Sequence, residues 1–182
     1  MSKYIKLMSK KITAEEVAYD GKFLKVNKYT IKNSNDQSEE IYECLERGDS
    51  VCAVVFNKET DKYLFVKQYR LGAKKDLIEL VAGMVDKEDS SLEDCIIREI
   101  VEELGYSVNK DDVRFLYSFY SSPGASTEKM HLFYVDVDQK ISKGGGVGDE
   151  DIEIVEFTAD ELMDLDRFED VKTILGAVWV NS

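Results

Sequence analysis

Three glutamates, Glu99, Glu102 and Glu103, lie close together in the stretch "REIVEELGY" at residues 98–106. On a helix that turns about 100° per residue, their carboxylates share one side, and the apolar residues share the other. Like charges one turn apart destabilise a helix by about 0.2–0.5 kcal/mol per pair. A bound cation would relieve that repulsion, and Mg²⁺ takes carboxylate oxygens together with substrate phosphates. The spacing therefore indicates a metal site, with a solvated acidic face as the alternative.

The helix that must present these carboxylates has recognisable ends. Ser90 and Glu93 have the spacing of a capping box, so we expect a helix from Leu92 to about Leu104, ended by Gly105. Arg98 lies one turn before Glu102 and would hold its carboxylate in place. The apolar, glycine-containing segment "LVAGMVD" at residues 80–86 precedes the helix and could bring a backbone carbonyl to the same face.

The segment "GMVDKEDSSLEDCIIREIVEELGY", residues 83–106, resembles the Nudix box, Gx5Ex7REUxEExGU with U apolar. The second half matches at every motif position, with Tyr106 as the final apolar residue. The first half departs, because the interval from Gly83 to Arg98 is one residue longer than in the family. Asp89 follows Gly83 where the family has its first glutamate, which leaves Asp89 and Glu88 as alternatives for that role.

The resemblance implies an α/β fold, a Nudix-type α/β/α sandwich with a mixed sheet, plus an N-terminal antiparallel β-sheet segment. Residues 1–48 would be that segment, with a role in dimerisation and nucleoside binding, and residues 49–182 the hydrolase domain. Alternating or continuous apolar patterns predict strands at residues 23–33, 40–48, 50–57, 61–70, 113–122 and 129–138. Thr158 and Glu161 would cap a first C-terminal helix. A second helix would bury one face, formed by Val171, Ile174, Leu175, Val178 and Trp179.

The resemblance also implies a site. Mg²⁺, with Mn²⁺ as a possible substitute, would be held by the carbonyl of Ala82 and by Glu99 and Glu103. The catalytic groups would be Glu102, Arg98 and an acid from the glycine-rich loop "KGGGVGDEDIE", which we expect to be mobile and to close over the substrate. Within that loop Glu150 is the first candidate for the base, and Asp149 and Glu153 are alternatives.

Other landmarks, "VKQYR", "SSPGAST" and "GGGVGDEDIEI", look like those of the ADP-ribose and nucleoside-diphosphate-sugar pyrophosphatase branch. They imply substrate contacts from Arg70, Pro123 and Gly124, and a homodimer. The implied reaction is Mg²⁺-dependent hydrolysis of the diphosphate of a nucleoside diphosphate sugar, first of all ADP-ribose, to a nucleoside monophosphate and a sugar phosphate. GDP-mannose and UDP-sugars are alternative substrates, and a catalytically weak nucleotide-binding sensor is the alternative class. A calcium-binding loop at "DKEDSSLED" lacks the spacing of an EF-hand.

Composition excludes other partners. The 182-residue chain has a formal net charge of −13 and no basic run, so we expect no nucleic-acid partner. No apolar run reaches about 18 residues and no signal-peptide pattern is present, so we expect no membrane contact. The three cysteines have no disulfide or zinc spacing, which favours a cytoplasmic protein with reduced thiols. We interpret His131, the single histidine, as structural.

Overall fold

The computed structural model describes residues 10–148 and 150–182, so Asp149 lies outside the described residues. The chain forms two compact units. One comprises residues 10–48 together with Ser122–Glu128, and the other comprises the described residues of Asp49–Ser121 and Lys129–Ser182. Pro123 and Gly124 therefore belong to the same unit as the N-terminal strands.

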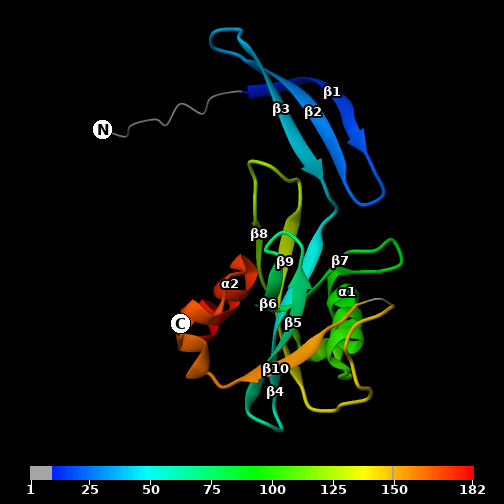
Figure 1. Cartoon of the computed structure of the whole chain (residues 1–182), viewed down its shortest axis with the longest axis vertical. Coiled ribbons are helices and arrows are strands. Elements are labelled where there is room, and N and C mark those ends of the chain that lie inside the picture. Colours follow the sequence, from blue (N-terminus) through cyan, green and yellow to red (C-terminus); the bar gives the residue numbers. More distant parts are fainter. Residues whose placement is uncertain (1–9, 149) are drawn as a thin grey trace. The chain divides into compact units, whose positions relative to one another are not determined.

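The first unit is an antiparallel sheet of three strands in the order β1 (Lys10–Asp20), β2 (Lys25–Asn33) and β3 (Glu39–Glu46) (Figure 1). β2 was predicted from its apolar alternation, and β3 was predicted as its hairpin partner. β1 was not, because it lies on one edge of the sheet and every residue of it is exposed, which leaves no buried face to produce a pattern. The loop Ser122–Glu128 joins this unit through hydrogen bonds of Leu45 with Ala125 and Thr127.

The second unit is built on a seven-stranded mixed sheet. Its main path runs β10 (Glu153–Phe157), β5 (Lys62–Arg70), β4 (Ser50–Asn57), β9 (Lys129–Val137) and β8 (Val113–Tyr120). β6 (Lys75–Glu79) pairs with β5, and β7 (Val81–Met84) pairs with β4. β4 and β9 are parallel, whereas the other pairings are antiparallel.

A helix covers each face of this sheet, α1 (Leu92–Glu99) on one and α2 (Val171–Val180) on the other (Figure 1). The central strand β4 divides its side chains between the two cores. Val51 and Val55 pack in the cluster that contains Ile96 of α1, and Val54 packs in the cluster that contains Ala177 of α2. Burial on both faces explains the continuous apolar run of β4. The predicted α/β/α arrangement with a mixed sheet is therefore confirmed.

The two C-terminal helical predictions need correction. Thr158 and Glu161 do form the reciprocal bonds of a capping box, but only short 3₁₀ turns follow, Glu161–Met163 and Leu165–Arg167. In α2 the predicted buried residues Val171 and Val178 are 55% and 47% exposed. Ile174, Leu175 and Trp179 are partly buried and pack against the core, as predicted. The most buried positions are Lys172, Thr173, Gly176 and Ala177. A β-carbon at Gly176 would meet Leu80 and Val54 side chains at 2.9 Å, so the helix approaches the sheet too closely there for a larger residue.

No helix within the described ranges is both long enough and apolar enough to cross a membrane.

Candidate functional site

The acidic helix begins and ends with local signals from its own residues. Ser91, in extended conformation, is the N-cap and accepts a hydrogen bond from Asp94 N at 3.1 Å, so the predicted cap at Ser90 was wrong by one residue. α1 continues into a π-helical turn, η1 (Ile100–Leu104), of a kind found often at functional sites. Gly105 ends it with a φ of 77°, as predicted.

Arg98 is the centre of a polar network that fixes the start of the acidic face. Its Nη1 donates to Glu99 Oε1 at 2.7 Å and to Glu102 Oε2 at 3.1 Å. Its Nε and Nη2 donate to the two carboxylate oxygens of Asp89 at 3.1 and 3.0 Å. The hydrogen bonds from Arg98 lower the pKa of Asp89 to about 2. Of the two candidates for the first acid of the box, Asp89 is therefore the one that contacts Arg98.

Glu99 points away from solvent toward the strand that precedes the helix. Its residue is 9% exposed, and burial raises the pKa of its carboxyl although Arg98 opposes the shift. Gly83 of β7 leaves the space that the carboxylate occupies, since a β-carbon there would lie 1.8 Å from Glu99 Oε1. A glycine is therefore required at residue 83 to make room for the Glu99 carboxylate.

Among the acids of this helix, Glu103 has the carboxyl pKa that is shifted most. It is 5% exposed, and burial raises the pKa of its carboxyl to about 8. Glu99 and Glu150 add to the rise, and a hydrogen bond that the backbone N–H of Ala82 donates to the carboxylate opposes it. Among the described residues its Oε2 atom has no hydrogen-bond partner. A buried carboxylate oxygen without a partner is costly, and such groups in native proteins are accounted for by water, an ion or function. The expected proximity of the Ala82 backbone to the acidic face is observed.

The glycine-rich loop docks on the end of this helix. Gly145 N and Gly146 N donate to Glu103 O at 2.8 Å and to Glu102 O at 3.1 Å, two carbonyls that the helix leaves free. Gly144, Gly145 and Gly146 all have positive φ, which explains three consecutive glycines. The three glycines therefore allow the backbone conformation that docks the loop on the helix, whereas closure of the loop over a substrate stays a prediction.

Glu150 lies in the same loop and close to the helix acids. Its charge raises the pKa of both Glu99 and Glu103. Its Oε2 accepts a hydrogen bond from Val147 N at 3.0 Å. A hollow of about 410 Å³ lies along this loop, lined by Lys143, Gly144, Gly145, Glu150, Asp151, Ile152, Glu153 and Ile154.

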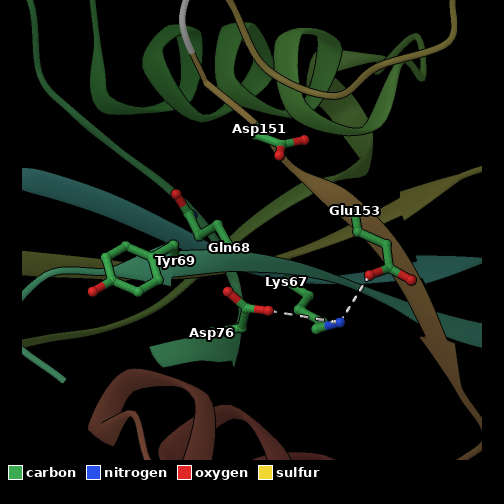
Figure 2. A pocket seen from close by; sticks show the side chains of 6 residues that line it. All are labelled: Lys67, Gln68, Tyr69, Asp76, Asp151 and Glu153. Carbon is green, nitrogen blue, oxygen red and sulfur yellow. Dashed lines mark hydrogen bonds and ion pairs between the residues drawn. The ribbon is translucent and has the colours of Figure 1, made fainter. Parts of the chain in front are cut away.

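Glu153 has a different environment. Figure 2 shows Lys67 between two carboxylates, with Nζ 3.0 Å from Glu153 Oε2 and 3.9 Å from Asp76 Oδ2. All three side chains line a second, shallow hollow of about 160 Å³. The ion pair gives Glu153 a structural partner, whereas Glu150 is the loop acid whose charge contributes to the raised pKa values of Glu99 and Glu103.

Arg70 is held by a network that the sequence did not reveal. Its Nε and Nη2 donate to Glu79 Oε1 and Oε2 at 2.6 and 2.8 Å, and Lys172 Nζ donates to Glu79 Oε2 at 2.5 Å. The charges of Arg70 and Glu103 are close enough to shift each other's pKa. A charged residue within the apolar pattern "DLIELVAG" was the signal that could have identified Glu79.

Two further predictions concern residues outside the acidic helix. Pro123 and Gly124 belong to the unit of β1–β3, and their contact with a ligand stays a prediction. His131 is buried, with Nδ1 2.8 Å from Ser118 Oγ and Nε2 3.0 Å from Asp49 Oδ2, which agrees with a structural role.

The acidic face fits a divalent cation. Glu99 and Glu103 are buried carboxylates with raised pKa values, one oxygen lacks a partner among the described residues, and the Ala82 backbone is adjacent. Within residues 10–148 and 150–182 no three Asp, Glu, His or Cys side chains form a complete cluster for a metal ion. Mg²⁺ is usually bound by one or two carboxylates together with waters and substrate phosphates, and Glu99 and Glu103 would supply such carboxylates.

Comparisons with known proteins identify the family of the chain and its fold. A family model described as "NUDIX domain" matches residues 46–175. The chain is 33% identical over 190 residues to a GDP-mannose pyrophosphatase of Citrobacter koseri, a match that covers 96% of this chain and 97% of the relative. It is 36% identical over 167 residues to a GDP-mannose pyrophosphatase of Yersinia enterocolitica, covering 84% and 85% of the two chains. A solved structure described as "Crystal structure of ADP compounds hydrolase" matches with a TM-score of 0.81 at 20% identity, covering 96% and 94% of the two chains, which shows a shared fold.

Proposed function

The chain belongs to the NUDIX domain family, and we propose that it hydrolyses the diphosphate linkage of a nucleoside diphosphate sugar. The products are a nucleoside monophosphate and a sugar phosphate. The observation that carries the proposal is the partnerless, buried Oε2 of Glu103, in the part of the chain that the structure describes, beside Glu99 and the Ala82 backbone. Such an oxygen is suited to a cation, and a cation is suited to the phosphates of this substrate class.

Nudix hydrolases generally use divalent metal ions, and for this chain we propose Mg²⁺, with Mn²⁺ as a substitute. Glu99, Glu103 and the carbonyl of Ala82 would hold it. When bound, the ion supplies neutralisation of phosphate charge and a more acidic water.

The chain's own residues supply orientation and proton transfer. Glu150 takes the proton of the attacking water, since its carboxylate lies in the loop beside the helix acids. Arg98 holds Glu99 and Glu102 in fixed orientation through its two short contacts. Arg70 offers a positive charge to the diphosphate near Glu103. The contact of Pro123 and Gly124 with the substrate stays a prediction from the resemblance.

The names of the relatives indicate which substrate should be tested first. The two relatives described above are named for GDP-mannose and match most of the chain, whereas the likeness to the ADP compounds hydrolase shows the fold alone. GDP-mannose is therefore the first substrate to test here, ahead of the sequence-based first choice ADP-ribose and of UDP-glucose.

The test is a Mg²⁺-dependent assay of the purified chain with GDP-mannose, ADP-ribose, UDP-glucose and diadenosine polyphosphates, each coupled to a phosphatase that releases phosphate from the products. We expect turnover of at least one nucleoside diphosphate sugar that is abolished by EDTA and restored by Mg²⁺. Tight binding of the same compounds without turnover, at any Mg²⁺ or Mn²⁺ concentration, would support the sensor class instead.

A further inference from the structure

Glu79 is a buried carboxylate that receives three charged hydrogen bonds. It is 2% exposed and lies at the end of β6, just before the β7 residues that support Glu99 and Glu103. Arg70 binds it with two parallel N–H groups at 2.6 and 2.8 Å, the arrangement that gives an arginine–carboxylate pair its fixed orientation. The second contact on Oε2 comes from Lys172, at 2.5 Å.

Lys172 belongs to the first turn of α2, on the opposite face of the sheet from the acidic helix. Its side chain is 8% exposed and its Nζ is also 2.9 Å from Asp170 Oδ2, the N-cap of α2. The next residue, Thr173, accepts a hydrogen bond from Leu80 N at 2.9 Å. The first turn of α2 is thus tied to both Glu79 and Leu80, the two residues that lead into β7.

The guanidinium of Arg70 has two edges with different roles. Glu79 occupies Nε and Nη2, whereas Nη1 has no hydrogen-bond partner within the described residues. The Arg70 side chain is 43% exposed, in contrast to the buried Glu79 and Lys172. A free N–H edge on a guanidinium with fixed orientation is well suited to phosphate oxygens.

The four charges of this network balance. Arg70 and Lys172 contribute two positive charges, and Glu79 and Asp170 two negative charges. If Lys172 is removed, Oε2 of a buried carboxylate loses its second donor, and Arg70 becomes the only charged partner of Glu79 in the network. We expect the Arg70–Glu79 pair then to rotate so that an N–H reaches the side of Oε2 that Lys172 occupied, and the guanidinium to lose its present orientation, because a buried carboxylate recruits donors to satisfy its oxygens.

We propose that Lys172 is a positioning residue for the substrate diphosphate: by holding Glu79 it fixes the plane of Arg70, whose free Nη1 edge then binds a phosphate oxygen. The inference rests on the proposed function and assigns to α2 a part in substrate affinity. Lys172 itself, enclosed by Glu79 and Asp170, does not touch the substrate.

The test is a double-mutant cycle with Lys172→Met, Arg70→Met and the double variant, measured on the nucleoside diphosphate sugar that the wild-type protein hydrolyses. We expect Lys172→Met to raise KM about tenfold, a typical size for coupled charged residues, with a much smaller change in kcat. In the Arg70→Met background it should change KM no further. Lys172→Arg should restore part of the affinity, because it returns a charged donor to Glu79.

Two controls separate positioning from general destabilisation. Lys58→Met removes an exposed lysine paired with Asp138 at 3.0 Å and should leave KM unchanged. Thermal unfolding of every variant is measured, and if Lys172→Met does not fold, Lys172→Gln enters the same cycle. An unchanged KM, or an effect of equal size with and without Arg70, overturns the proposal.

A binding experiment distinguishes failure of this proposal from failure of the proposed function. If the wild-type protein hydrolyses no nucleoside diphosphate sugar, the same four proteins are titrated with inorganic pyrophosphate and Mg²⁺ by calorimetry. Weaker pyrophosphate binding by Lys172→Met that disappears in the Arg70→Met background supports the positioning role. Equal binding by all four proteins overturns it.

Discussion

The carboxylate of Glu99 lies over Gly83, in space that any side chain at residue 83 would fill: a β-carbon would be 1.8 Å from Glu99 Oε1 and 2.0 Å from Glu99 Cδ. The obstructed atoms are the end of a flexible side chain, so Gly83→Ala can be accommodated by moving Glu99. We therefore expect Gly83→Ala to fold but to lose about 10²-fold in kcat, the scale of one displaced transition-state group. Steady-state kinetics with thermal unfolding checks this.

The matched control is Gly72→Ala, since no atom lies within 4 Å of a β-carbon there. It should leave both kcat and the midpoint of unfolding close to the wild-type values. If Gly83→Ala kept full activity, the present position of Glu99 would be irrelevant to catalysis.

The raised pKa of Glu103 gives a pH dependence with a definite sign. Burial raises this pKa from 4.5 to about 8, so between these values the folded protein holds a proton that the unfolded chain releases. Stability is then greatest at the acid end of this range and falls as pH rises to about 8, with no further change from this group above it. We expect the urea midpoint of metal-free wild-type protein to fall between about pH 5 and pH 8 more than that of Glu103→Gln.

The same variant tests the cation. Mg²⁺ should stabilise the wild-type protein more at pH 8 than at pH 5, because a cation competes with the proton for the carboxylate. Glu103→Gln should lose this effect and about 10²-fold in kcat. Parallel pH profiles for the two metal-free proteins would contradict the assignment of the perturbed carboxyl to Glu103.

Substitutions of Glu150 and Glu153 should have different effects on activity, because the two side chains have different partners. Glu150→Gln should lower kcat by about 10²-fold with a smaller change in KM, because a general base acts mainly in the transition state. Glu153→Gln removes an exposed ion pair with Lys67, so we expect kcat to change by less than about threefold. Asp149→Asn is measured beside them. A silent Glu150→Gln together with an inactive Asp149→Asn would move the base by one residue.

We also expect the chain to be a homodimer that depends on the strands β1–β3. The dimer is implied by the resemblance described above, and Val17 and Ile41, which are 55% and 62% exposed, are apolar positions in this unit that an interface would cover. Light scattering should give the mass of two chains. Val17→Glu and Ile41→Glu, which introduce charge at exposed positions, should lower that mass without lowering the unfolding midpoint. A monomeric wild-type protein with full activity would end the dimer prediction.

Much of this structure could be predicted because local signals agree with it. Gly105 ends the helix as expected, and the continuous run at β4 is buried on both faces. The tie between Glu79 and Lys172 could not be predicted, because it joins residues 93 positions apart whose meeting depends on the packing of α2. The buried face of α2 was predicted in part: Ile174, Leu175 and Trp179 pack against the core, whereas Val171 and Val178 are exposed. Hydrophobicity favoured the two valines, while close approach to the sheet requires Gly176.

Two glycines of the loop that contains Glu150 have nearly equal φ angles but different surroundings. Gly144 and Gly148 have φ values of 69° and 66°, so alanine at either position pays a left-handed penalty of about 1 kcal/mol. At Gly144 a β-carbon would also meet backbone atoms, 2.6 Å from Glu103 O and from Leu104 C, whereas at Gly148 it would meet none within 4 Å. Backbone cannot rotate away as a side chain can. Gly144→Ala should therefore displace the loop from the helix end, lower the unfolding midpoint further than Gly148→Ala does, and reduce kcat by taking Glu150 away from Glu103. Equal effects of the two substitutions on stability and kcat would show that docking of the loop on the helix contributes nothing to the reaction.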